Sequence, residues 1–121
     1  MREEHCDQFV ADCRLRAATE LFAHTWDVVV MAALRDGPMR RRELRARIGA
    51  ISDKVLTETL QRLSGHGLVA REPGAGLRID YRLTALGASL LEGPLRALGA
   101  WMAEHGDELL HAQEPVREEK P

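Results

Sequence analysis

The sequence predicts a mainly α-helical (α+β) fold that carries one small β-hairpin. Apolar residues recur at helical spacing in four successive segments before residue 66. Over residues 68–83 the period changes to the alternation of short strands, and after Thr84 it becomes helical again. Four helices, a hairpin and a further helix follow the order of a winged helix-turn-helix. The 121 residues give room for one such domain.

The first helix is expected over residues 12–22, from apolar residues at helical spacing: Leu15, Ala18, Leu21 and Phe22. Thr25 is expected to cap a second helix, and the negative charge of Asp27 suits the positive start of that helix. The sequence Asp-Gly-Pro at 36–38 ends it. Its buried face is expected to comprise Trp26, Val29, Val30, Ala33 and Leu34.

A short third helix is expected over residues 41–48, with Leu44 and Ile48 facing the core. The fourth helix has the clearest signals, because the acceptor side chain of Ser52 stands where free N–H groups need a cap. Glycines at 65 and 67 end this helix. Its apolar stripe comprises Val55, Leu56, Leu60 and Leu63.

The hairpin is expected to consist of strands at 68–71 and 79–83 joined by a turn at 73–76. Thr84 then caps a helical run from 86 to about 111, with a bend at Gly93-Pro94. The chain is thus divided into an N-terminal arm at 1–11 and a winged-helix domain at 12–111. A polar, acidic tail at 112–121 is expected to be disordered.

Charge is distributed unevenly along the chain. The net charge of -2 argues mildly against a nucleic-acid partner, but residues 35–62 carry eight basic and four acidic side chains, a local charge of +4. Affinity for DNA depends on this local footprint. The chain starts without a secretory signal, and no apolar run reaches the roughly 20 residues of a membrane span. We therefore expect a cytoplasmic protein with no membrane contact.

Several stretches resemble the HxlR-type regulators, which are winged helix-turn-helix proteins of the MarR-like superfamily. ISDKVLTETLQRL at 51–63 with GLVAR at 67–71 is similar to the family pattern GIS-KVLT-RL--L---GLV-R. DYRLT at 80–84, followed by Gly87, resembles the segment -EYSLT--G. Cys13 and Trp26 have the family's separation, and the likeness covers about residues 13–105. It departs at 23–25, where Ala-His-Thr replaces the usual Gly-Gly-Lys.

The resemblance implies a bacterial transcriptional regulator, expected to be a repressor, that binds a pseudo-palindromic operator in double-stranded DNA as a homodimer. It also implies that the first and last helices pair the two subunits. An apolar stripe on the last helix fits this role, because it is too apolar for an isolated surface helix. The expected interface residues are Leu15, Leu91, Leu95, Leu98, Trp101 and Met102.

Candidate DNA contacts lie on the third and fourth helices and on the hairpin. DNA recognition needs cations that neutralise phosphates and short polar groups that reach base edges. Arg78 is the candidate of the hairpin, and the alternative is that these side chains form ordinary solvated faces. The third helix contributes Arg41, Arg42 and Arg45, and the fourth contributes Ser52, Asp53, Lys54, Thr57, Gln61 and Arg62.

Thiol chemistry is a second candidate function. The resemblance implies that a cysteine at position 13 can sense oxidants, quinones or aldehydes, and Arg14 and Arg16 beside Cys13 would favour its thiolate. Cys6 is the other candidate, and the alternative for either is a small buried hydrophobe. A small-molecule effector pocket near Phe22, Trp26 and Trp101 at the dimer junction is also left open.

Other classes of function have weaker support. A winged-helix protein-interaction module without sequence-specific DNA binding is the alternative, but the arginines at 40–47 argue against it because interface cores are seldom so cationic. The sequence contains no recognisable catalytic triad, phosphate loop or carboxylate pair, so we predict no enzyme and no cofactor. We also predict no metal site, because His5, Cys6, Cys13 and His24 lack a recognised ligand spacing.

Overall fold

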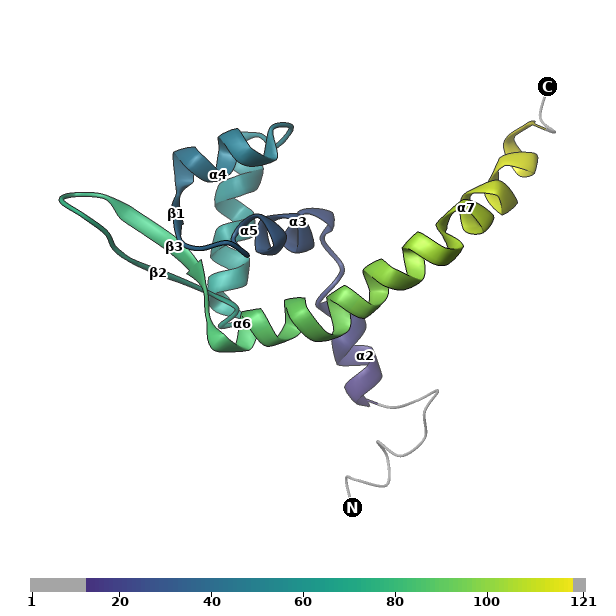
Figure 1. Cartoon of the computed structure of the whole chain (residues 1–121), viewed down its shortest axis with the longest axis horizontal. Helices are drawn as coiled ribbons and strands as arrows, with labels where there is room; N and C mark the ends of the chain where they lie inside the picture. Colours follow the sequence, from purple (N-terminus) through teal and green to yellow (C-terminus); the bar gives the residue numbers. More distant parts are fainter. Residues whose placement is uncertain (1–12, 119–121) are drawn as a thin grey trace, which may run out of the picture.

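The computed structural model describes the secondary structure of residues 13–118 and the side chains of residues 14–112 (Figure 1). Its small sheet and surrounding helices confirm the predicted winged helix-turn-helix. The elements in chain order are α2 (Cys13–Glu20), α3 (Thr25–Ala33), β1 (Met39–Arg40), α4 (Arg41–Ile48), α5 (Asp53–Gly65), β2 (Val69–Pro73), β3 (Ile79–Leu83), α6 (Ala85–Leu90), the π-helical segment η1 (Leu91–Leu95) and α7 (Arg96–Glu118).

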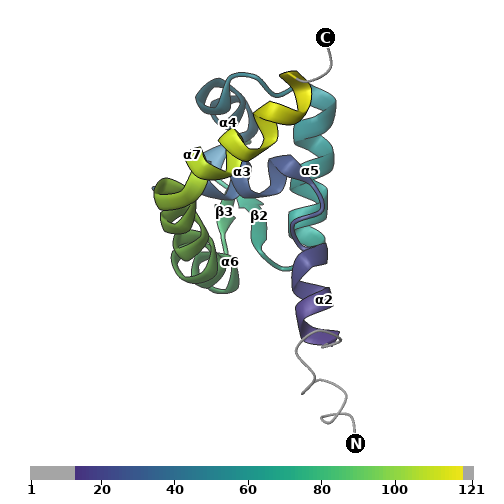
Figure 2. The ribbon, with the colours of Figure 1, turned by 90° about the vertical axis from the view of Figure 1, so that its right-hand side faces the viewer.

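The hydrophobic core lies where α3, α4 and α5 pack together beside the sheet (Figures 1 and 2). Aliphatic side chains fill it, as expected from a sequence in which only 4% of residues are aromatic. Trp26 is half-buried and packs against its edge. The buried set includes Val30, Met31 and Leu34 of α3, Leu44 of α4, and Leu56, Leu60 and Leu63 of α5.

The start of α3 differs from the prediction. Thr25 is the first helical residue rather than the cap, because the Asp27 N–H already bonds to the carbonyl of His24 at 3.2 Å. The buried face is also rotated, so that Asp27 is buried while Val29 is 36% exposed. The prediction that Val29 belongs to the core is therefore wrong. Val30, Ala33 and Leu34 are buried as predicted.

Helices α4 and α5 have the predicted bounds because their ends are set locally. Gly49 has a φ of 90°, a left-handed conformation that favours glycine, and it ends α4. The hydroxyl of Ser52 then accepts a hydrogen bond from the Val55 N–H at 3.2 Å and caps α5. Four residues, 49–52, thus separate two helices that share one core.

The sheet has three antiparallel strands in the order β1-β3-β2. Strands β2 and β3 form the predicted hairpin, which projects from the body (Figure 1), with Val69 opposite Leu83 and Arg71 opposite Tyr81. The two-residue strand β1 adds Met39 opposite Tyr81 on the other edge of β3. The sequence did not predict β1 because two residues show no alternation.

Two contacts fix α6 against the body. The Thr84 hydroxyl accepts from the Gly87 N–H at 3.0 Å, as predicted for a cap, and donates to the Gly67 carbonyl at 2.7 Å. Gly87 lies so close to the carbonyl of Leu68 that an added Cβ would be 2.1 Å from its oxygen. A side chain at position 87 therefore has no room.

The predicted bend at residues 93–94 lies inside η1, where Pro94 has no N–H for the helical ladder. Leu91 and Leu95, in the same segment, are 9% and 8% exposed within the core of their own chain. Their assignment to a dimer interface is therefore corrected.

Beyond η1, α7 leaves the body (Figure 1) and continues to Glu118 rather than to about 111. It includes much of the stretch expected to be a disordered tail, since Ala, Gln, Glu and Arg there favour helix. Residues 119–121 lie outside the described chain. Between residues 13 and 118, no helix combines the length and apolarity required to cross a membrane.

Candidate nucleic-acid interface

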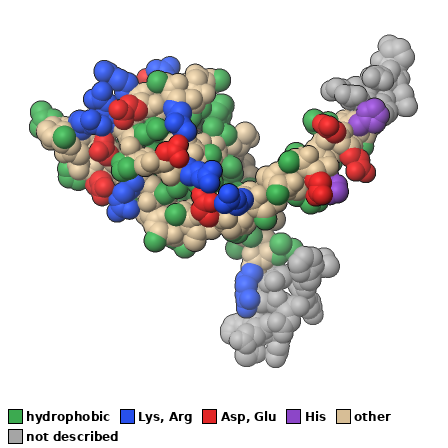
Figure 3. Space-filling view, in the orientation of Figure 1, with side chains coloured by type: hydrophobic (Ala, Val, Ile, Leu, Met, Phe, Trp, Pro, Cys, Tyr) green, Lys and Arg blue, Asp and Glu red, His purple; other side chains and the backbone are tan. Residues whose placement is uncertain are grey.

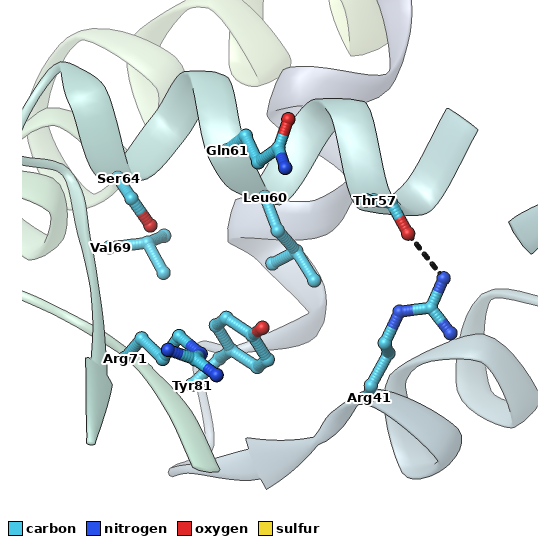
Figure 4. A pocket seen from close by; sticks show the side chains of 8 residues that line it. All are labelled: Arg41, Thr57, Leu60, Gln61, Ser64, Val69, Arg71 and Tyr81. Carbon is cyan, nitrogen blue, oxygen red and sulfur yellow. Dashed lines mark hydrogen bonds between the residues drawn. The ribbon is translucent and has the colours of Figure 1, made fainter. Parts of the chain in front are cut away.

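The exposed side of α5 faces the hairpin across a groove of about 580 Å³. Figure 4 shows Thr57, Gln61 and Ser64 along α5, with Arg71 and Tyr81 of the hairpin opposite them. Arg41 of α4 lines the same groove, close to the start of α5. In Figure 3, basic side chains gather over α4 and its junction with the hairpin, with acidic side chains between them. The groove is thus walled by the three elements predicted to contact DNA.

Arg41 ties α4 to the first turns of α5. Its guanidinium donates to a carboxylate oxygen of Asp53 at 3.1 Å, to the Asp53 carbonyl at 2.8 Å and to the Thr57 hydroxyl (Figure 4). Arg45 lies 3.5 Å from the same Asp53 oxygen and donates to the Ile51 carbonyl. Asp53 and Thr57, both predicted to contact DNA, are therefore hydrogen-bonded to Arg41 within the chain.

Arg62 has a different role from the one predicted. It turns toward α3 and donates to both carboxylate oxygens of Asp27, at 2.7–3.2 Å, and to the Thr59 hydroxyl at 3.3 Å. The hydrogen bonds to Asp27 raise the pKa of Arg62 above its usual range, against the opposing effect of burial. Arg62 therefore joins α5 to α3, and its assignment as a DNA contact is corrected. The sequence offered no signal for a pair 35 residues apart.

Lys54 and Gln61 are the predicted contacts that α5 presents freely. Both are exposed, and seven residues place them on the same face of the helix. Arg42 of α4 is exposed as well. Within residues 14–112, none of these three side chains has a hydrogen bond or ion pair. Ser52, in contrast, uses its hydroxyl as the cap of α5.

The hairpin presents a different arginine from the one predicted. Arg78 lies 3.3 Å from Asp80 and 3.7 Å from Glu43 of α4, so it is held between two carboxylates. Arg71 is exposed and has no such partner among residues 14–112. It stands opposite Tyr81 in the strand register and lines the groove with it. Strand alternation was the signal that could have placed Arg71 and Tyr81 on one face.

The remaining candidates lie on α2 and α7. Leu15 is 37% exposed, while Leu98, Trp101 and Met102 are 51%, 46% and 41% exposed. Cys13 begins α2, but its side chain and the whole of Cys6 lie outside the described residues. No group of three metal-ligating side chains occurs among the residues described.

Comparison with known proteins gives consistent matches. The family described as HxlR-like helix-turn-helix matches residues 21–109. The uncharacterised HTH-type transcriptional regulator YtfH of Escherichia coli is 32% identical over 114 residues, covering 93% of this chain and 86% of that protein. The HTH-type transcriptional regulator YodB of Bacillus subtilis is 30% identical over 99 residues, covering 78% and 88%. The crystal structure of quinone-bound YodB superposes with a TM-score of 0.64 at 28% identity, covering 75% of this chain and 97% of that one.

Proposed function

This chain belongs to the HxlR-like helix-turn-helix family and is a DNA-binding transcriptional regulator, and on that premise we propose that it represses transcription as a homodimer on a pseudo-palindromic operator. In this proposal α5 enters the major groove and the hairpin reaches the adjacent minor groove. The repressive effect is steric, because an occupied operator excludes other proteins from the promoter.

The observation that carries the DNA contact is the set of unpaired polar side chains around one groove. Gln61 and Arg71 line the groove, and Lys54 lies seven residues before Gln61 on the same face of α5. Arg42 lines the adjoining hollow at α4. Gln61 has the geometry to pair with adenine, and Lys54 can donate to guanine or to a phosphate. Arg42 and Arg71 are suited to phosphates, because they are cations that need no intramolecular bond to be broken.

Dimerisation is supported by the apolar stripe of α7. Helix α7 projects from the body (Figure 1) and carries exposed apolar side chains at helical spacing. They are Leu98, Trp101, Met102 and Leu109. A stripe of this kind on an isolated helix favours pairing with a second copy. Two copies related by a two-fold axis would present two α5 helices to half-sites about 34 Å apart.

Selection of duplexes from a random pool by the purified chain tests this function. We expect enrichment of an inverted repeat with half-sites about one helical turn apart, and light scattering should give the mass of a dimer. Trp101→Ala should shift the mass toward a monomer and weaken operator binding. A pool that stays random, with binding that shows no dependence on salt, would favour the protein-interaction module instead.

For the signal that releases DNA, we propose an electrophile that adds to a thiol, and the likeness to the quinone-bound structure of YodB supports a quinone as that electrophile. We infer that Cys13 is this thiol, since it begins α2 with Arg14 and Arg16 following it in sequence. Treatment with 1,4-benzoquinone should abolish DNA binding by the wild type and by Cys6→Ser, while Cys13→Ser should keep it. Equal loss in all three proteins would reject Cys13. The effector pocket predicted near Phe22, Trp26 and Trp101 stays a prediction.

A further inference from the structure

Most arginines around the groove already have carboxylate partners in the absence of DNA. Arg41 and Arg45 meet Asp53, and Arg78 meets Glu43 and Asp80. The local charge of +4 over residues 35–62 therefore overstates the number of cations that are free to meet phosphates. Each paired arginine must leave, or share, its carboxylate before it can neutralise a phosphate.

Among these carboxylates, Asp53 is the one that holds two arginines of α4 at the start of α5. One of its oxygens lies 3.1 Å from Arg41 and 3.5 Å from Arg45, and its side chain is 61% exposed. Asp53 lines a hollow with Arg41 and Arg42, and Arg41 also lines the groove at α5, so this negative charge adjoins the side that meets DNA in the proposed function. The cap of α5 does not need Asp53, because the hydroxyl of Ser52 accepts from Val55.

We propose that Asp53 is a specificity-determining residue that lowers the affinity of this regulator for nonspecific DNA. Nonspecific binding depends almost entirely on cations that meet phosphates. Asp53 holds Arg41 and Arg45 and repels phosphates itself, so it weakens that electrostatic contribution. Sequence-dependent contacts made by Lys54 and Gln61 are then required for tight binding. The proposal rests on the proposed function, because it assumes that this face contacts DNA.

Asp53 is also one of the DNA contacts expected from the sequence, and the competing role is that it reads a base. A carboxylate can accept a hydrogen bond from the N4 amino group of cytosine. The two roles predict opposite results when Asp53 becomes asparagine. A base reader would lose affinity for its preferred duplex and leave random DNA unaffected. A residue that restrains nonspecific binding would raise the affinity for random DNA.

The test compares wild type with Asp53→Asn on two probes, a 20-base-pair duplex of random sequence and a duplex selected by the wild type. We expect affinity for random DNA to rise about fivefold, the scale of one unit charge a few ångströms away in water. The slope of log K against log[salt] should steepen by about one. Affinity for the selected duplex should rise less, so the ratio between the two falls.

The matched control is Asp36→Asn. Asp36 is an exposed carboxylate 3.2 Å from Arg47, and both line a hollow between α3 and η1, away from the groove at α5. Its removal changes the net charge by the same amount and should leave the ratio unchanged. In an Arg41→Gln, Arg45→Gln background, Asp53→Asn should raise random-duplex affinity less than it does in the wild type, because only the direct repulsion between Asp53 and phosphates is left to remove.

Three results would overturn the proposal: unchanged affinity for random DNA, an equal rise on both probes, or a loss confined to the selected duplex. Circular dichroism checks that each variant folds. Asp53→Ser is a second way to remove the carboxylate, because serine is well accepted at the start of a helix. The random-duplex arm requires no operator. A wild type that selects no sequence would therefore reject the proposed function, while the response of random-duplex binding would still decide the role of Asp53.

Discussion

Replacing Asp27 by asparagine is expected to weaken the attachment of α5 to α3. Asp27 is 4% exposed and receives three hydrogen bonds of 2.7–3.2 Å from Arg62. Asparagine keeps the volume of the side chain but removes the charge. It also leaves one oxygen where Arg62 now bonds to two. The substitution thus isolates the ion pair from the packing around it.

The loss in the free energy of unfolding can be bounded from the burial of the two partners. Breaking a buried ion pair by removing one partner costs about 3–5 kcal/mol. Because the Arg62 side chain is 25% exposed, its guanidinium can recover some hydration when the pair is lost. We therefore expect a loss of about 2–3 kcal/mol, or a fall in melting temperature of roughly 10 °C for a domain of this size.

Urea unfolding followed by circular dichroism at one fixed protein concentration would measure this loss. The fixed concentration matters because the stability of a dimer depends on it. Asp36→Asn is again the control, since its exposed pair with Arg47 should contribute about 0–1 kcal/mol. If Asp27→Asn loses no more stability than Asp36→Asn, the ion pair between Asp27 and Arg62 does not hold α5 to α3.

The pH dependence of the stability difference between wild type and Asp27→Asn gives a further check on the ion pair. Asp27 raises the pKa of Arg62 in the folded chain. A raised pKa means that the stabilisation is fully present below the pKa of the unfolded arginine and is lost only as the pH rises through the higher folded value. The difference between wild type and Asp27→Asn should therefore stay constant from neutral pH to well into the alkaline range. A decline near pH 9 would show that another group is involved.

Three further substitutions test other parts of the structure. Gly87→Ala should destabilise the fold by about 1–3 kcal/mol in urea titration, because the new Cβ would lie 2.1 Å from the Leu68 carbonyl oxygen, whereas Gly93→Ala meets nothing within 4 Å and serves as control. Thr84→Ala should lower the free energy of unfolding by about 1–2 kcal/mol, while Thr84→Ser keeps both hydroxyl bonds. Equal melting temperatures of these two variants would contradict the capping role. Lys54→Ala should reduce the salt slope of DNA binding by about one. An unchanged slope would exclude Lys54 from phosphate contact.

The parts of the fold that the sequence predicted are those determined over short distances. The bounds of α4 and α5 follow from a turn glycine, from the cap Ser52 and from helical periodicity, all within a few residues of each other. The hairpin follows from alternation and from its turn. Strand β1 could not be predicted because its existence depends on β3, about 40 residues away along the chain.

The sequence predicted which elements carry the candidate DNA contacts, but it could not predict which of those side chains form ion pairs within the chain. Lys54, Gln61 and Arg42 are exposed as expected, yet Arg62 faces Asp27, and helical periodicity cannot reveal a partner on another helix. The last helices show the same limit, since Leu91 and Leu98 are seven residues apart on one stripe. Leu91 is buried in the core of its own chain, while Leu98 is 51% exposed. Sequence spacing gives the stripe but not what covers each part of it.

The junction at η1 makes α7 a lever. Its 23 residues extend about 34 Å at 1.5 Å per residue, so a rotation of only about 5° at Leu91–Leu95 would displace the far end by roughly 3 Å. In a dimer paired through α7, the same small rotation would occur in both subunits and change the distance between their two α5 helices. Base pairs are spaced about 3.4 Å apart along the duplex. A small rotation within the single π-helical turn would thus shift each α5 helix relative to its half-site by nearly one base-pair step.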